Sequence, residues 1–200
     1  MKILLVLAAI ISLYASTQEA LQAYKNQEYK KAFRLYIESA KRGDIAAQNA
    51  VSYLYFNGIG TQKSQQKGLK WLQMAAESSD KRACFDLGMM YLSGVNIKKD
   101  LPKAAKYLQI ASEKGNSDAT YNLALMYYNG DGVKQDLNKA TSLLEKAAKS
   151  GHIAAKHNIG RVYMQILNFK KAKQWLRENV KDGDLEAADL LKEIEAAKKE

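Results

Sequence analysis

The sequence predicts an all-α protein, a right-handed superhelical solenoid of antiparallel helix pairs. Three observations support this fold class. Alanines recur every 36 residues, at Ala47, Ala83, Ala119 and Ala155. Tyrosines recur with the same period, at Tyr55, Tyr91, Tyr127 and Tyr163. Within each copy, apolar residues follow helical spacing. A period of this length is typical of stacked units that bury their apolar faces against one another. Such arrays usually work by presenting a surface, so we expect function at positions that the repeat leaves free.

The N-terminal residues have the pattern of a secretory signal peptide. Lys2 supplies the positive charge, residues 3–11 form an apolar run too short for a comfortable membrane span, and Ala15 is a small residue at the expected cleavage site. Leu13 is not the ideal small residue upstream of that site, so an uncleaved anchor is the alternative. We expect a signal peptide at 1–15 and a periplasmic or secreted protein with no stable membrane span after cleavage.

Charge and cysteine content narrow the classes of partner. The chain has 31 lysines and arginines against 21 aspartates and glutamates, a net charge of +10. This balance favours an acidic protein or peptide partner or an anionic envelope surface. Because the protein is expected to be exported, a nucleic-acid partner is not expected. Cys84 is the one cysteine, which excludes an intramolecular disulfide, so stability is expected to come from packing.

Each repeat divides into two predicted helices. In the third copy, residues from Ala119 to Tyr127 keep helical spacing until Gly130 and Gly132 interrupt them. A second helix is predicted from Asp136 up to Ser150 and Gly151. The glycines permit the positive backbone dihedrals that a tight connection between helices needs.

The position that opens the second helix carries good N-cap residues, namely Ser64, Asp100, Asp136 and, after a four-residue deletion, Asn168. Pro102 falls in the first turn, where the missing amide hydrogen costs little. Ser64 and Lys67 also match the serine-x-x-lysine motif of penicillin-recognising enzymes. The other elements of that motif set are missing from the sequence, so we interpret Ser64 as a cap.

The order of these residues resembles the SLR (Sel1-like repeat) family, relatives of the tetratricopeptide repeat (TPR). The shared pattern is an alanine, a leucine-glycine pair, a tyrosine, a glycine loop, an aspartate and a lysine-alanine pair. One copy has it at Ala83, Leu87, Gly88, Tyr91, Gly94, Asp100, Lys103 and Ala104. The resemblance implies an SLR/TPR-like fold and a non-enzymatic scaffold or adaptor for protein-protein interaction in the bacterial envelope or outside the cell.

The repeat boundaries divide the chain into seven segments. The predicted organisation is a signal peptide at 1–15, an N-terminal capping hairpin at 16–46, repeats at 47–82, 83–118 and 119–154, a shortened TPR-like repeat at 155–186 and a C-terminal helical cap at 187–200. The fourth repeat lacks the glycine loop. Polar end units of this kind keep a solenoid from associating end to end, so a monomer is expected.

By analogy with TPR arrays, the first helices line a concave face that binds a partner peptide. The candidate binding residues are Asn49, Phe85, Asp86, Met89, Tyr121, Asn122, His157, Asn158 and Arg161. Tyr53 and Leu125 continue the same row. Side-chain amides one repeat apart suit the backbone of an extended peptide, and the aromatic residues offer apolar pockets. The alternative is that the polar residues solvate a helix face and the aromatic residues belong to the core.

No catalytic residue, cofactor site or metal site is predicted. His152 and His157 are five residues apart and do not share a helix face. Some cysteine-rich relatives carry a β-lactamase or penicillin-binding assignment, which leaves such an activity as an alternative, and a cell-wall glycan binder as another. In those relatives a cysteine pairs with the position of Cys84, but the corresponding sites here are Ala76, Ser112 and Ala148. Cys84 is expected to be a buried thiol, with intermolecular pairing as the alternative.

Overall fold

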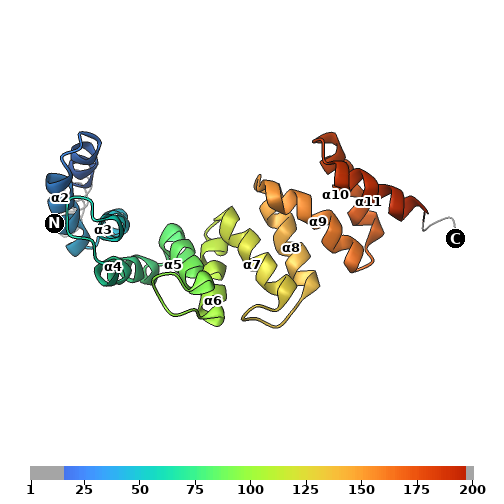
Figure 1. The fold of residues 1–200 in the computed structure, drawn as a ribbon, viewed down its shortest axis with the longest axis horizontal. Helices are drawn as coiled ribbons and strands as arrows, with labels where there is room; N and C mark the ends of the chain where they lie inside the picture. The colour runs from blue at the N-terminus through green and yellow to red at the C-terminus, as the bar shows by residue number, and fades with distance from the viewer. Residues whose placement is uncertain (1–15, 197–200) are drawn as a thin grey trace, which may run out of the picture. The chain divides into compact units, whose positions relative to one another are not determined.

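The computed structural model describes residues 16–196, so the predicted signal peptide lies outside the described residues. Within this range the protein is all-helical and contains no strand (Figure 1). Residues 16–25 are helical. They are followed by α2 (Tyr29–Lys41), α3 (Ile45–Asn57), α4 (Gln65–Glu77), α5 (Lys81–Ser93), α6 (Leu101–Glu113), α7 (Ser117–Asn129), α8 (Leu137–Lys149), α9 (Ile153–Gln165), α10 (Phe169–Lys181) and α11 (Leu185–Ala196). The predicted all-α class is confirmed.

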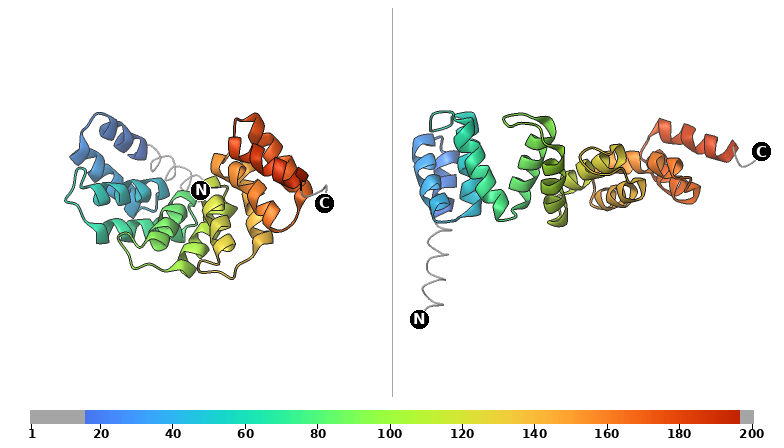
Figure 2. Two further views of the ribbon diagram at one scale, coloured as in Figure 1. Left: turned by 45° about the vertical axis from the view of Figure 1, so that its right-hand side comes forward. Right: turned by 90° about the horizontal axis from the view of Figure 1, so that it is seen from below.

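The chain forms two compact units, and the boundary between them, after Leu87, falls within α5. In the first unit α2 packs against α3, and α3 against α4. In the second unit each helix from α6 to α11 packs against the next, as the two views of Figure 2 also show. We call α3, α5, α7, α9 and α11 the A helices and α2, α4, α6, α8 and α10 the B helices. Residues 16–25 are the A helix that pairs with α2.

Side-chain caps open the helices at the positions that the sequence predicts. The side chains of Ser64, Asp100, Asp136 and Asn168 each accept a hydrogen bond from the backbone N–H three residues on. Pro102 lies in the first turn of α6. The A helices are capped too, by Asp44, Asp80, Asn116, His152 and Asp184. His152 uses Nδ1 as the acceptor, 3.1 Å from the amide nitrogen of Ala155, a role that the sequence reasoning did not assign to it.

A small residue of each A helix faces a large one of its B helix. A Cβ atom added to Gly88 would lie 2.9 Å from Cγ of Leu108, and one added to Gly160 would lie 2.7 Å from Cδ2 of Leu176. Buried leucines repeat at this position of the B helices, at Leu72, Leu108, Leu144 and Leu176. The small residues at the partner position are Ser52, Gly88, Ala124 and Gly160. The helices of a pair approach closely because the residue opposite the leucine is small, and at Gly88 and Gly160 it has no side chain at all.

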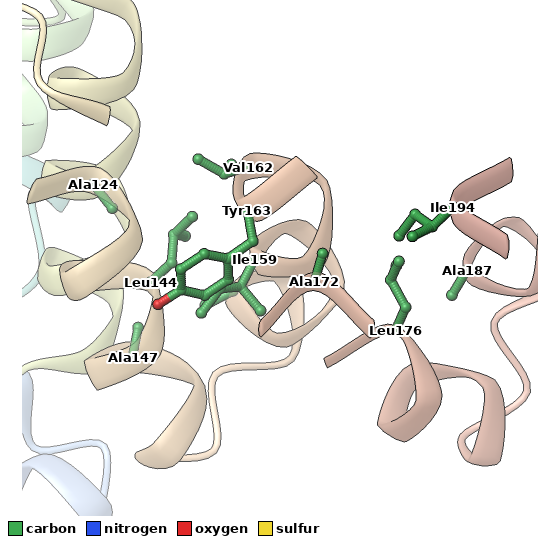
Figure 3. Close-up of a cluster of buried hydrophobic side chains, with 11 residues drawn as sticks. Ala124, Leu144, Ala147, Ile159, Val162, Tyr163, Ala172, Leu176, Ala187 and Ile194 are labelled. Atoms are coloured by element: carbon green, nitrogen blue, oxygen red, sulfur yellow. The ribbon is translucent and has the colours of Figure 1, made fainter. Parts of the chain in front are cut away.

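The end of the second unit has a continuous core (Figure 3). Leu144 lies against Ile159 and Tyr163, and Leu176 lies between α9 and the side chains of Ala187 and Ile194 on α11. Each of these side chains is at most 3% exposed. The last A helix is therefore held by apolar packing.

Cys84 is fully buried, as expected, and its thiol donates to the carbonyl oxygen of Ala76 over 3.5 Å.

The glycine loops fold back on the preceding helix pair. Gly60 and Gly132 have φ values of 67° and 68°, and a Cβ atom at either would overlap the backbone of a B-helix N-terminus, at Tyr29 for Gly60 and at Leu101 for Gly132. Asn96 occupies the same place in the second repeat with φ of 65°. The loops thus need both a left-handed conformation and, at Gly60 and Gly132, the absence of a side chain.

Replacing Gly132 with Ala is expected to lower the free energy of unfolding by about 2 kcal/mol or more, because the methyl group adds an overlap with Leu101 to the cost of the positive φ. Gly151→Ala is the matched control. Gly151 has φ of 86° but open space around its Cβ position, so only the backbone cost of about 1 kcal/mol applies. Urea unfolding of both variants measures the difference, and equal losses would contradict the assigned close approach.

Candidate functional site

An aromatic hollow lies between the first two A helices. It has a volume of about 190 Å³ and is lined by Leu21, Tyr24, Tyr36, Ala50, Tyr53, Leu54 and Arg82. We call it the first hollow. Tyr53 is 48% exposed and Leu21 37%, so both are accessible to a partner. Arg82, near the start of α5, supplies the positive charge at its edge.

A second hollow lies between α7 and α9. Its volume is about 200 Å³, and it is lined by Leu125, Tyr128, Leu144, Asn158, Arg161 and Val162. We call it the second hollow. Its apolar floor comes from α7 and α8, while Asn158 and Arg161 of α9 provide the polar groups.

The two hollows occupy the same position of the repeat. Tyr36, Ala50, Tyr53 and Leu54 are each 108 residues, or three periods, before Leu144, Asn158, Arg161 and Val162. Leu21 and Tyr24 are 104 residues before Leu125 and Tyr128, because the first helix pair lacks the four residues of the glycine loop. The repeat geometry therefore produces a side-chain-sized pocket between an A helix, its B helix and the next A helix.

Two tyrosines of the first hollow, Tyr24 and Tyr36, have hydroxyl groups with raised pKa values. Burial, and then a hydrogen bond with Tyr53, raises the pKa of the Tyr24 hydroxyl above its ordinary value. Burial is also the main reason that the pKa of Tyr36 is raised. Arg82 lies near the carboxylate of Asp86, with Nε and Oδ2 separated by 3.9 Å, and both side chains are well exposed. The hollow is thus apolar and aromatic, with hydroxyl groups inside it and a cation beside it.

The second hollow has an ion pair at its edge instead. Arg161 pairs with Glu186 of α11, and its Nη1 lies 3.5 Å from Oδ1 of Asn158. Nδ2 of Asn158 donates to the hydroxyl oxygen of Tyr121 over 2.8 Å. Allowing for the missing loop residues, Glu186 stands at the repeat position of Arg82. The charge at that position is therefore reversed between the two hollows.

Several of the predicted binding residues connect successive A helices. Nδ2 of Asn49 donates to Oδ1 of Asp80 over 3.0 Å, and Nδ1 of His157 lies 2.9 Å from Oδ2 of Asp184. Both aspartates cap the next A helix. The ring of Tyr121 stacks on His152, the cap of α9, at a centroid distance of 4.4 Å. Asn49, Tyr121 and His157 share one repeat position, which joins α3, α7 and α9 to the cap of the next A helix.

The other predicted residues are less closely grouped. Asn158 and Arg161 line the second hollow, and Asp86 contacts Arg82 of the first. Nδ2 of Asn122 donates to the carbonyl oxygen of Asp118 on its own helix. Phe85 and Met89 are half-buried on α5 and line neither hollow.

Sequence reasoning missed the floor of both hollows. Tyr24, Tyr36 and Tyr128 were not predicted as site residues, because the helical pattern alone assigns such aromatic residues to the core, and Arg82 at the edge of the first hollow was not predicted either. The identity of Leu21 with Leu125 and of Tyr24 with Tyr128, once the loop deletion is counted, is the signal that relates them.

Among residues 16–196 no three histidine, cysteine, aspartate or glutamate side chains are grouped to hold a metal ion. Within the same range no helix combines the length and the apolar character that crossing a membrane requires.

Fold and site together define a helical-repeat protein with side-chain pockets between successive helix pairs. The model of the Sel1 repeat family matches residues 23–44, 45–80, 81–116 and 117–152, and the chain belongs to this family. Sel1 repeats generally mediate protein interactions, and their solenoids are typically non-enzymatic scaffolds. Among curated proteins no sequence matches the chain.

Three solved structures illustrate the similarity. A protective antigen of uropathogenic Escherichia coli with an SLR fold is 23% identical with a TM-score of 0.81; the match covers 90% of this chain and 40% of that protein. A Sel1 repeat protein from Oxalobacter formigenes is 28% identical with a TM-score of 0.77, over 88% of this chain and 74% of the other. Cysteine-rich protein B of Helicobacter pylori is 30% identical with a TM-score of 0.51, and the match covers 64% of this chain and 92% of that protein.

The contact between His157 and Asp184 predicts a pH dependence. The pKa of Asp184 is held below its ordinary value, chiefly because its carboxylate accepts a hydrogen bond from the N–H of Ala187. Burial opposes this shift, and the contact with His157 adds to it. A lowered carboxyl pKa stabilises the fold above the ordinary pKa of about 3.9, and this contribution is lost as pH falls through the lowered value. Asp184→Asn keeps a cap acceptor but removes the charge.

The midpoint of thermal unfolding should therefore be lower for Asp184→Asn than for the wild type at about pH 5, and the two should converge towards about pH 2. Asp189→Asn, which changes an exposed carboxylate of the same helix, serves as the control and should follow the wild type at every pH. A difference that stays constant down to pH 2 would show that the charge of Asp184 is not responsible.

Proposed function

We propose that the protein is a non-enzymatic scaffold or adaptor of the bacterial envelope, or a secreted one, that binds a peptide segment of a partner protein along its A helices. The pattern of residues 1–15 supports the export part of this proposal. The net charge of +10 supports an acidic partner.

The single observation that carries the binding proposal is the recurrence of a hollow at one repeat position. The volumes of about 190 and 200 Å³ are those of pockets for single side chains rather than for a whole cofactor. Tyr53 and Arg161 occupy the equivalent place in the two hollows, and tyrosine and arginine are the residue types that contribute most at protein interfaces. Each hollow can therefore take one side chain of a bound peptide.

The chemistry of the first hollow favours an apolar or aromatic side chain followed by a carboxylate. The side chain would fill the space between Leu21, Tyr24 and Tyr53, and the carboxylate would lie towards Arg82. At the second hollow Glu186 already neutralises Arg161, so an apolar side chain with a polar backbone contact to Asn158 fits better. The two hollows are thus expected to select different side chains.

Tyr53→Ser and Arg161→Ala are each expected to weaken partner binding about tenfold or more, because they remove the accessible wall of one hollow. The partner is first obtained by crosslinking in the native envelope and mass spectrometry, and affinities are then measured by calorimetry with the purified partner. Neither variant should lower the midpoint of thermal unfolding by more than about 3 °C, since Tyr53 is half-exposed and Arg161 lies at the edge of its hollow.

Val95→Ser is the control for Tyr53→Ser. It removes an apolar side chain that is 58% exposed in a glycine loop and lines neither hollow, and it should bind like the wild type. The double variant Asn122→Ala with Asn158→Ala tests the predicted row of amides, of which Asn158 also lines the second hollow. If the hollow variants keep full affinity, the partner uses another face of the molecule.

The proposal that the protein is not an enzyme is supported by the environment of Ser64. Its Oγ accepts the backbone N–H of Lys67 over 3.3 Å, as an N-cap does. The ammonium group of Lys67 lies 5.6 Å from the centroid of the Tyr55 ring, in the same lysine-tyrosine pairing that three other repeats show. The periodic structure thus accounts for both residues of the apparent motif.

Purified protein is expected to show no turnover of nitrocefin above the rate of spontaneous hydrolysis, because Lys67 is not placed to activate Ser64 as a nucleophile. The assay is followed by absorbance, with Ser64→Asp as a variant that keeps the cap and removes the hydroxyl. Turnover by the wild type that this variant lacks would establish the hydrolase and reject the scaffold proposal.

A further inference from the structure

A cationic and apolar surface at the turn between α9 and α10 has no role in the hollows described above. It surrounds an open hollow of about 780 Å³ whose lining includes Leu167, Phe169, Lys170, Lys173 and Arg177. We call these five residues the α9–α10 turn surface. It shares no residue with the second hollow.

The shortened fourth repeat creates this surface. In the first and third repeats the glycine loop packs over the N-terminus of the preceding B helix, as Gly60 does at Tyr29 and Gly132 at Leu101. The fourth repeat lacks these residues and turns tightly through Leu167 instead. Leu167 is 73% exposed and Phe169, the first residue of α10, is 40% exposed. Two large apolar side chains therefore project at a turn.

The charges around these side chains are positive and largely uncompensated. Lys170 and Lys173 make no ion pair with any residue of the described range 16–196, and Arg177 has a carboxylate of Glu195 no nearer than 3.9 Å. The neighbouring Lys171 is engaged by Glu145 at 3.2 Å. An occupant of this surface should therefore bring negative charge.

The same arrangement extends to the preceding helix pair. A hollow of about 680 Å³ lies at the start of α8, and its lining includes Lys134, Leu137 and Lys139 together with one carboxylate, the cap Asp136. Leu137 corresponds to Phe169 once the loop deletion is counted, and α8 and α10 both pack against α9. Cations and apolar residues thus continue along two neighbouring helix starts, which fits an extended anionic plane better than a single peptide.

We propose that the α9–α10 turn surface binds the anionic lipid surface of a membrane. Leu167 and Phe169 enter the boundary between headgroups and acyl chains, and Lys170, Lys173 and Arg177 contact lipid phosphates. Apolar insertion combined with basic residues is the physical basis of peripheral membrane binding. This proposal is independent of partner binding in the two hollows.

The test is cosedimentation of the full chain with vesicles of phosphatidylethanolamine and phosphatidylglycerol at 3:1, compared with phosphatidylcholine vesicles. The apolar residues 3–11 would bind both kinds of vesicle, so the readout is the difference between the two partition coefficients. The wild type should prefer the anionic vesicles, and the preference should fall as salt is added. Equal binding to both vesicles would overturn the proposal.

Two double variants locate the contact. Lys170→Gln with Lys173→Gln should reduce the preference about 25-fold, or about fivefold for each lysine. Leu167→Ser with Phe169→Ser should reduce binding to the anionic vesicles more than tenfold. Thermal unfolding checks that both double variants are folded. The lysine double variant changes only surface charge, so it still tests the proposal if the apolar double variant is unstable.

The controls change the same residue types at the other ends of the helices of the second unit. Ile153→Ser removes a side chain that is also 73% exposed, and Lys114→Gln with Lys149→Gln removes two exposed lysines. Both should bind like the wild type. If the controls lose as much vesicle binding as the test variants, the proposal is overturned. An absence of vesicle binding would also overturn it and would instead favour an acidic protein segment as the occupant.

Discussion

The fold depends on the close approach of the two helices within each pair. A small residue on the A helix and a leucine on the B helix recur at equivalent positions in four successive pairs, and at Gly88 and Gly160 the space for even a methyl group is already occupied by Leu108 and Leu176. Because this contact repeats, every pair presents its remaining side chains at the same positions. The caps at both helix starts and the glycine loops complete a unit whose geometry is fixed by short-range constraints.

Regular geometry explains why the same hollow occurs twice with different walls. The floor is made by residues that the repeat keeps similar, such as Leu21 and Leu125 or Tyr24 and Tyr128, while the edge is made by positions that vary, such as Tyr53 and Arg161. Side chains at the edge can therefore differ from one hollow to the other without disturbing the packing below them. The reversal of charge between Arg82 and Glu186 is an example within one chain.

The departure of the fourth repeat from the pattern has a structural consequence of its own. Without the glycine loop, the start of α8 lacks the backbone that packs over the starts of α2 and α6, and the tight turn at Leu167 leaves apolar side chains beside lysines at the start of α10. In the repeats that keep the loop at Gly60 and Gly132, backbone packs over the corresponding helix start. Binding of a peptide to the hollows and binding of a lipid surface to the turn would therefore use separate parts of the molecule.

The sequence by itself determined the fold class, the helix starts and the burial of Cys84. These follow from local rules and from the 36-residue period, since caps such as Ser64 and Asp136 act within four residues. Only the tertiary structure decided which polar residues are committed to contacts between repeats. Asn49 and His157 were predicted to face a partner, yet each reaches the capping residue of the next A helix, about 30 residues away in the chain. Such contacts, and hollows walled by three helices, depend on distances between repeats that a one-dimensional pattern does not contain.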